Sequence, residues 1–240
     1  LVKDEDAETI SVFRSGMDEP ILVQNARDDH RPYIHPIVAP DGKGVLTEYA
    51  PGHHKHQTGL YWGFTRVNGR DYFHNPSGGY WQLVESKILA GSGEVVQWET
   101  VYHLLNEEST AIMEESQVWS MRDTGDKYFL DLLWSGKAHT EVTVGKYNYG
   151  GLFLSMPWKR GKIEGEVFNS SRQRNDRAEG QKAMWVNVGM EIEGRDDWGN
   201  IAIFDHPDNP TYPMAWRVDK QLGVGPVSYT HLTLPTICSV

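Results

Sequence analysis

Residues 80–122 read YWQLVESKILAGSGEVVQWETVYHLLNEESTAIMEESQVWSMR, and this stretch decides the fold. It holds three long segments, 80–89, 94–105 and 110–122, in which apolar and polar residues alternate. A Gly-Ser-Gly run and an Asn-Glu-Glu-Ser run separate the segments, and both are typical of turns. Because successive side chains of a strand point to opposite faces, the stretch predicts an antiparallel meander of three strands.

Two of the predicted strands have faces that mix polar and aromatic residues. In the second segment, one face is predicted to consist of Val96, Trp98, Thr100, Tyr102 and Leu104. In the third, one face is predicted to consist of Met113, Glu115, Gln117, Trp119 and Met121. Such a face can line a sugar-binding groove or face solvent on the outside of a sheet, and the sequence leaves both open.

Shorter alternating segments lie on both sides of the meander, and helical periodicity is nearly absent. Strands are expected near residues 9–14, 20–25, 45–49, 126–144, 183–192 and 199–204. Residues 31–37 contain Pro32 and Pro36, which forbid a helix and predict an edge strand or an extended arm. The fold class is therefore predicted to be all-β, an antiparallel β-sandwich of a large, supersandwich-like kind with very little helix.

The composition narrows the classes of partner. With 39% hydrophobic and 23% charged residues, the 240-residue chain reads as a globular protein with ample material for a core. No run approaches the roughly 18 apolar residues that a membrane-spanning helix needs, so no membrane span is expected. The net charge of -10 argues against nucleic acid and anionic lipid, which require a basic face, and leaves neutral or cationic ligands open.

Residues 227–240 read VSYTHLTLPTICSV, carry no charged side chain, and resemble the translation of a transposon adaptor used in sequencing libraries. We therefore expect one sandwich domain at residues 1–226, with its natural N- and C-termini missing, followed by an adaptor-derived tail. The tail is expected to pack poorly or to fill an open sheet edge, and burial of Leu232, Leu234 and Ile237 on a continuous sheet would argue against this origin. The tail also holds the only cysteine, Cys238, so the rest of the chain has no disulfide and no cysteine metal site.

Three of the ten histidines, His53, His54 and His56, follow the Pro51-Gly52 turn signal and precede an aromatic segment with strand character. If this stretch is extended, His54 and His56 point the same way and His53 points away. Paired histidines can bind a divalent metal or a substrate. The alternative is a surface turn whose histidines are solvated or bonded to the backbone.

A second polar motif, FDHPDNPTYP, occupies residues 204–213, and its three prolines restrict the conformation of the loop. It displays Asp205, His206, Asp208 and Asn209. An aspartate beside a histidine can orient or charge it for acid–base chemistry. The alternative is that Asp208 and Asn209 only cap a turn.

Several motifs resemble those of a bacterial family that carries the label PmoA, or methane oxygenase. They are RPYIHP at 31–36, APDG at 39–42, HHKHQTGLYWG at 53–63, IAIFDHP at 201–207 and WRV at 216–218. The resemblance covers most of residues 31–225 and implies a β-sandwich protein, periplasmic or secreted, from among bacterial sugar-degradation proteins. The family usually reads HPHHRG in the histidine loop, so this chain lacks the arginine and differs in its histidine count. A membrane methane monooxygenase subunit needs several apolar spans, which excludes that activity.

Two functions are compatible with these features. The first is a bacterial carbohydrate-active enzyme, a hydrolase or lyase, whose histidine-rich pocket uses either a divalent metal or acid–base side chains. The second is a non-catalytic carbohydrate-binding or interaction module with an aromatic platform. A deep pocket of histidines and carboxylates would favour the enzyme, whereas a flat aromatic face would favour the module.

For the enzyme, the two polar loops are predicted to meet in one pocket, with Arg31 or His35 nearby; otherwise each loop caps its own end of the sandwich. The catalytic candidates are His54, His56, Asp205 and His206, and the metal candidates are His54 and His56. The substrate-binding candidates are Arg31, His35, His53, Tyr61, Trp62, Asp208 and Asn209. The expected partner is a carbohydrate, as a small molecule or a glycan.

Overall fold

The computed structural model describes residues 1–148, 150–157, 163–218 and 223–227, together with the backbone of 232–234. Strands make up 52% of the chain and helix 1%, which confirms the all-β prediction. The elements, in chain order, are β1 (Val2–Asp4), β2 (Thr9–Val12), β3 (Leu22–Asn25), β4 (Tyr33–Ile37), β5 (Leu60–Gly63), β6 (Trp81–Ala90), β7 (Val95–Leu105), β8 (Ala111–Asp123), β9 (Tyr128–Ala138), β10 (Val142–Val144), β11 (Gly151–Ser155), β12 (Gly165–Asn169), the 3-10 helix η1 (Asn175–Arg177), β13 (Gln181–Lys182), β14 (Trp185–Glu191), β15 (Trp198–Phe204), β16 (Ala215–Val218), β17 (Gly223–Val227) and β18 (Leu232–Leu234).

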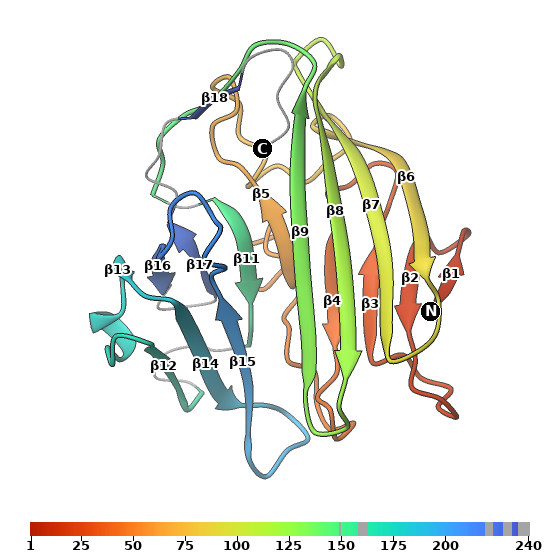
Figure 1. The fold of residues 1–240 in the computed structure, drawn as a ribbon, viewed down its shortest axis with the longest axis vertical. Coiled ribbons are helices and arrows are strands. Elements are labelled where there is room, and N and C mark those ends of the chain that lie inside the picture. The colour runs from red at the N-terminus through yellow and green to blue at the C-terminus, as the bar shows by residue number, and fades with distance from the viewer. Residues whose placement is uncertain (149, 158–162, 219–222, 228–231, 235–240) are drawn as a thin grey trace.

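The described strands form one large sheet and three smaller ones. The nine-stranded sheet has the order β1-β2-β3-β4-β5-β11-β17-β16-β13, and the four-stranded sheet has the order β6-β7-β8-β9. The three-stranded sheet has the order β12-β14-β15, and β10 pairs with β18. In Figure 1 the four-stranded sheet lies in front of β2, β3 and β4, and the three-stranded sheet lies at the lower left. The architecture is therefore a sandwich in which one large sheet faces two smaller ones.

The meander predicted from residues 80–122 forms the first three strands of the four-stranded sheet. The predicted face of β8 is buried throughout, and so is that of β7 apart from the half-buried Val96. These faces point into the sandwich, so their polar residues lie inside the protein and not on a solvated outer surface. β6 lies at an edge of this sheet, and its register with β7 shifts between Leu83 and Glu85 and between Ile88 and Ala90.

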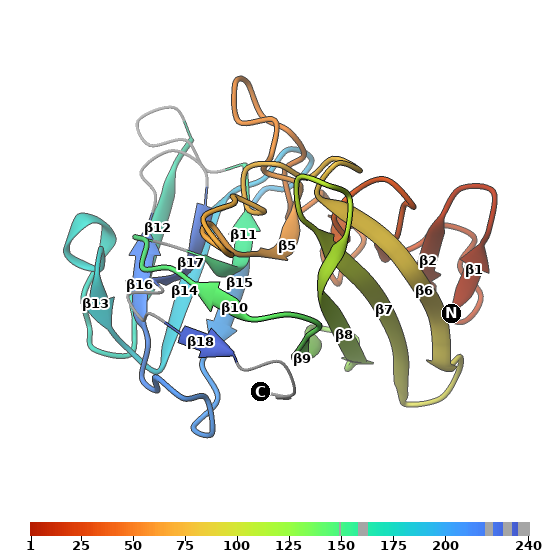
Figure 2. The same ribbon diagram turned by 90° about the horizontal axis from the view of Figure 1, so that it is seen from above.

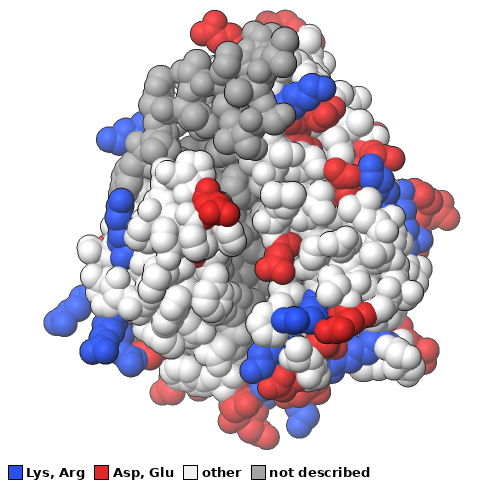
Figure 3. Space-filling model, viewed as in Figure 1, with Lys and Arg blue, Asp and Glu red and all other residues white. Residues whose placement is uncertain are grey.

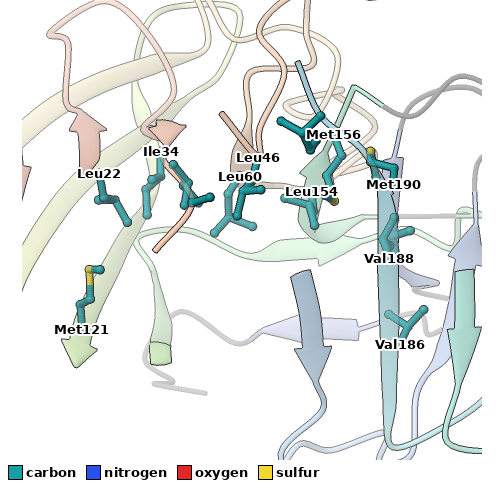
Figure 4. Packing of buried hydrophobic residues seen from close by; sticks show 14 of the residues in the cluster. Leu22, Ile34, Leu46, Leu60, Met121, Leu154, Met156, Val186, Val188 and Met190 are labelled. Atoms are coloured by element: carbon teal, nitrogen blue, oxygen red, sulfur yellow. The ribbon is translucent and has the colours of Figure 1, made fainter. Parts of the chain in front are cut away.

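One apolar cluster joins the three main sheets. In the first half of the sandwich, Leu22, Ile34 and Leu60 of the nine-stranded sheet pack in the same cluster as Met121 of β8. In the second half, Leu154 of β11 packs with Val186, Val188 and Met190 of β14. Figure 4 shows these side chains as a continuous row from β3 to β14. Close packing in this cluster fixes the inner face of the nine-stranded sheet. The histidine loop at residues 53–56 lies on the opposite, outer face of the same sheet.

The prediction that the proline-containing segment 31–37 forms an edge strand or an extended arm is wrong. It forms β4, which lies between β3 and β5 inside the nine-stranded sheet and not at its edge. The register between β3 and β4 shifts from the pair Gln24–Ile34 to the pair Leu22–Ile37. This irregularity removes Pro36 from the regular ladder, which is how an interior strand can contain a proline.

The tail contributes a short strand, because β18 pairs antiparallel with β10 through Leu232–Leu234. The side chains of Leu232 and Leu234, and all of Ile237, lie outside the described residues. No described helix combines the length and the apolar character that crossing a membrane requires. Figure 3 shows the face of the four- and three-stranded sheets, whose centre is mostly uncharged and whose described Lys and Arg residues lie mainly toward its margins.

Candidate functional site

The site begins with an aromatic cluster on the outer face of the nine-stranded sheet. Tyr33 of β4 and Tyr61 of β5 are direct cross-strand neighbours, and both belong to a buried cluster with Phe73 and Phe153. The Arg31 guanidinium lies 3.7 Å from the centroid of the Tyr61 ring. Tyr61 is fully buried beneath it, so its ring cannot stack on a sugar as predicted.

Arg31 is itself fully buried and connects two loops. Its guanidinium donates hydrogen bonds to the carbonyl oxygen of His56 at 2.6 Å, to Thr58 Oγ1 at 3.3 Å, and to the carbonyl oxygen of Phe73. Burial lowers the pKa of Arg31 to about 10. Arg31 therefore lies near the histidine loop, as predicted, but it positions the loops from below and is shielded from any ligand.

The histidine loop is not extended. The backbone N–H of His54 donates to the Pro51 carbonyl oxygen at 2.9 Å, and that of Gln57 donates to the His54 carbonyl oxygen at 3.1 Å. The loop therefore consists of successive turns. The turns bring the His54 and His56 rings to a centroid distance of 5.9 Å, and the His53 ring to 4.0 Å from His54. The rings of His54 and His56 therefore lie near each other although the loop is not extended, and His53 packs against His54 and does not point away.

An aspartate–histidine pair that the sequence analysis missed completes the cluster. His74 Nδ1 lies 2.7 Å from Asp71 Oδ2, and Asp71 Oδ1 accepts the backbone N–H groups of Phe73 and His74 at 3.0 Å each. The His74 ring lies 4.5 Å from the His56 ring. The signal was present as an Asp-x-x-His sequence directly after the Asn68-Gly69 hairpin signal, since an aspartate there bonds the next backbone amides.

Two pKa values of this cluster are shifted. Burial lowers the pKa of His56 to about 3, and the nearby His74, Arg31 and His54 act in the same direction. Burial alone would raise the pKa of Asp71, but the hydrogen bonds from His74 and the neighbouring backbone outweigh it and the pKa lies below its ordinary value. At neutral pH the cluster therefore contains a neutral His56 and an ionised Asp71.

The same face extends along β4. His35 Nδ1 lies 2.9 Å from Thr47 Oγ1, and its ring stacks on Tyr49 at 5.7 Å. Tyr49 is 44% exposed and also contacts the ring of Tyr33 at 5.5 Å. Burial lowers the pKa of His35. The exposed Tyr49 ring thus lies next to His35 on the outer face of the nine-stranded sheet. We call this part of the sheet, which carries His35, Tyr49, His53, His54, His56 and His74, the histidine face.

Trp62 does not belong to this face. It follows Tyr61 in β5 and therefore points to the other side of the sheet, where its ring stacks on Trp134 of β9 at 4.9 Å and 18°. This position does not fit the prediction that Trp62 binds substrate at the histidine loop.

The Asp205 loop is separate from the histidine face. Asp205 is buried, and its two carboxylate oxygens accept hydrogen bonds from Asn209 Nδ2 and the backbone N–H of Met214, both at 2.8 Å. His206 and Asp208 are exposed, and His206 Nδ1 accepts the backbone N–H of Asp208 at 3.2 Å. Asp205 and Asn209 therefore stabilise the loop, so the turn-capping alternative fits Asn209, whereas Asp208 is exposed.

The predicted meeting of the two loops is not seen. Figure 2 shows the orange segment before β5 and the blue loop between β15 and β16 on opposite sides of the molecule. A metal at His54 and His56 also lacks a third ligand here, since no described carboxylate or histidine joins them in a group of three within 4.8 Å.

A buried carboxylate lies inside the sandwich. Glu115 of β8 is 1% exposed, and Gln117 Nε2 donates to its Oε1 at 2.6 Å. Burial raises the pKa of Glu115 to about 7, although Gln117, Trp134 and Arg31 oppose the shift. From the sequence, Glu115 is one of several candidate carboxylates for the enzyme and a polar position on one face of β8.

Comparison with known proteins places the chain in a family. The model of a family of unknown function, DUF6807, matches residues 20–236, so the chain belongs to this family. No curated protein and no solved structure matches.

Proposed function

We propose that this member of DUF6807 is a carbohydrate-active enzyme, a hydrolase or lyase, whose reactive groups are His74, His56 and His54. The observation that carries the proposal is the 2.7 Å pair between Asp71 Oδ2 and His74 Nδ1. A carboxylate hydrogen-bonded to Nδ1 fixes the orientation and the tautomer of an imidazole, which is the arrangement that general acid–base chemistry uses. The Arg31 guanidinium donates to the carbonyl oxygen of Phe73, the residue before His74, and so fixes the loop that carries the pair. This contact supports a positioned pair and not a chance surface contact.

His56 gives the pair a second function. With a pKa of about 3 it stays neutral at physiological pH and can accept a hydrogen bond from a substrate hydroxyl group. A neutral imidazole is also the form that binds a divalent metal, and an aspartate behind a histidine is a common feature of metal sites. The described side chains place no third ligand within 4.8 Å of His54 and His56, so acid–base chemistry is the proposed form, and the experiment below separates it from metal-assisted chemistry.

A carbohydrate is the proposed substrate because of the aromatic ring beside the histidines and the negative charge of the chain. The exposed Tyr49 ring next to His35 offers an aromatic surface of the kind that stacks on sugar rings. The net charge of -10 disfavours polyanionic substrates. The resemblance to bacterial sugar-degradation proteins points the same way.

The test is turnover of a library of neutral glycans by the purified protein. His74→Gln is expected to lower kcat by about 100-fold or more, because general acid–base groups contribute that much. Lys182→Gln, on the exposed β13, is the matched surface control and should leave turnover unchanged. Sensitivity to EDTA, with recovery on adding zinc, would select the metal-assisted form. Full activity of His74→Gln would refute the proposed site.

A second candidate function, a carbohydrate-binding module, is favoured by a different observation. On the outer face of the three-stranded sheet, Trp185 and Phe204 are direct cross-strand neighbours, and the Phe168 ring lies 5.5 Å from that of Trp185. Phe204 is 70% exposed. Neighbouring aromatic rings on the outer face of a sheet offer a surface on which a polysaccharide chain can stack.

Binding to insoluble polysaccharides tests this second function. Phe204→Ala is expected to weaken binding by about tenfold, since such a ring contributes of the order of 1.4 kcal/mol. Phe129→Ala removes another exposed ring, which is 44% exposed and lies on the outer face of β9, and serves as the control. Equal binding by both variants would contradict a platform at Phe204.

A further inference from the structure

A second cluster of metal-ligating side chains lies on the four-stranded sheet. His103 of β7 and Glu114 of β8 are direct cross-strand neighbours, and His139 directly follows β9. The backbone N–H of His139 donates to Ile112 at 2.9 Å, which continues the ladder beyond the end of β9. The inward neighbours Leu104 and Met113 are fully buried, so strand alternation places His103 and Glu114 on the outer face of the sheet.

The distances among the three side chains suit a bound ion. His103 Nε2 lies 3.6 Å from Glu114 Oε2, and the rings of His103 and His139 lie 5.4 Å apart. One ligand atom from each residue can be chosen so that all lie within 4.8 Å of one another. Zinc binds nitrogen and oxygen at about 2.0–2.2 Å, so neighbouring tetrahedral ligands lie roughly 3.4 Å apart. The His103–Glu114 pair is already close to this spacing.

Closing the remaining distance between the ligand atoms requires movement of His139, the most exposed of the three residues. His139 is exposed, so its ring can rotate toward the other two without displacing core residues. His103 and Glu114 are held by adjacent strands, and their side chains are only 25% and 33% exposed. Two ligands are therefore preorganised, and binding needs to order only the third.

We propose that His103, Glu114 and His139 bind a divalent transition-metal ion, with zinc as the best fit. Two imidazoles and one carboxylate form a donor set that suits zinc better than calcium or magnesium, which prefer oxygen ligands. Three protein ligands leave a fourth position for water or for an atom of a bound molecule. The ion would also tie three adjacent strands together at one end of the sheet.

The site is distinct from the histidine face. His103, Glu114 and His139 belong to the four-stranded sheet, whereas the histidine face belongs to the nine-stranded sheet. The principal competitor for the carboxylate is Lys137, which is the cross-strand neighbour of Glu114 on β9. Without a metal, the cluster would be an ordinary surface pair of His103 and Glu114 with a solvated His139.

Zinc titration of the full-length protein against a chromophoric chelator tests the proposal. The metal-stripped protein should bind zinc, and both His103→Gln and Glu114→Gln should weaken this binding by at least about tenfold because each removes one of three ligands. The matched control is Glu107→Gln, which removes an exposed carboxylate from the turn between β7 and β8 and should leave zinc binding unchanged. Zinc should also raise the Tm of the parent protein and of Glu107→Gln more than that of His103→Gln.

Two results would overturn the site. One is equal zinc affinity in the parent, His103→Gln and Glu114→Gln, which would assign any bound zinc to other residues. The other is the absence of zinc binding below millimolar concentration in the parent. If His103→Gln fails to fold, Glu114→Gln still decides the question because it keeps the size and shape of the side chain, and circular dichroism without metal checks its fold.

Discussion

Glu115 shows how a single residue can set the pH response of the molecule. It is the end of a buried polar chain in which the Trp119 indole N–H donates to Gln117 Oε1 at 3.2 Å and Gln117 Nε2 donates to Glu115 Oε1 at 2.6 Å. The surrounding sheets remove the carboxyl group from water, which disfavours its ionised form. Protonated Glu115 is therefore the form that the folded protein prefers below pH 7.

Replacing Glu115 by Gln should change how stability depends on pH. The folded pKa of about 7 lies above the ordinary 4.5, so the unfolded chain releases its proton first, and raising the pH from 4.5 to 7 destabilises the folded parent. The loss amounts to at most about 3 kcal/mol, and it persists above pH 7. Glu115→Gln cannot titrate, so its advantage over the parent should grow between pH 5 and pH 8 in urea unfolding. An advantage that stays constant across this range would contradict the buried, uncharged Glu115.

At this scale the sequence predicted some of the site and missed its central pair. Alternation correctly assigned Glu115 and its neighbours to one face, but the pattern could not say that another sheet covers that face. His54 and His56 were found because they lie close in sequence. Asp71 and His74 were missed because their importance arises from a contact with His56, and a contact between loops leaves no periodic signal in either loop.

The junction between the histidine loop and β5 depends on one glycine. Gly59 has a φ of +79°, and a Cβ at this position would overlap the Ile34 carbonyl oxygen and lie 2.9 Å from the Cβ of His35. Both contacts are with β4, the neighbouring strand, whose backbone cannot move aside cheaply. This close approach is what allows the loop to fold back over the sheet beside Arg31.

Gly59→Ala is therefore expected to destabilise the protein by at least about 3 kcal/mol, from the left-handed backbone together with the clash. Gly52→Ala, in the same loop with φ of +54° and nothing within 4 Å of the added Cβ, should cost only about 1 kcal/mol. Urea unfolding of both variants measures the difference. Equal costs would mean that β4 yields to the added methyl group.

Among the elements, long strands were predicted best and the order of strands was not predicted at all. The meander is specified by local alternation and short turns, so sequence reasoning found it. The interior place of β4 was missed because Pro36 suggests an edge, and only the shifted register beside β3 reconciles the proline with a central strand. The pairing of β5 with β11 joins segments about 90 residues apart, and no local signal encodes it.

For the whole molecule, the shared core predicts cooperative unfolding. The same apolar cluster contains Trp98 and Trp119 of the four-stranded sheet and Val186 and Val188 of the three-stranded sheet. Native-state hydrogen exchange should therefore give the same opening free energy for the amides of β7 and of β14. A lower value for β14, with unfolding of its sheet as a separate step, would contradict a single core.

The irregular edge strand β6 has a consequence for behaviour at high concentration. A ten-residue edge would be a template onto which another chain could add as an extra strand. Its two register shifts break the regular spacing of free N–H and C=O groups, and Lys3 Nζ and the Asp28 carbonyl oxygen already engage Ser86 and Leu83. Glu85 and Lys87 add charges beside exposed apolar residues. These features disfavour the addition of a strand from another molecule at this edge, so we expect β6 not to nucleate edge-to-edge aggregation at high protein concentration.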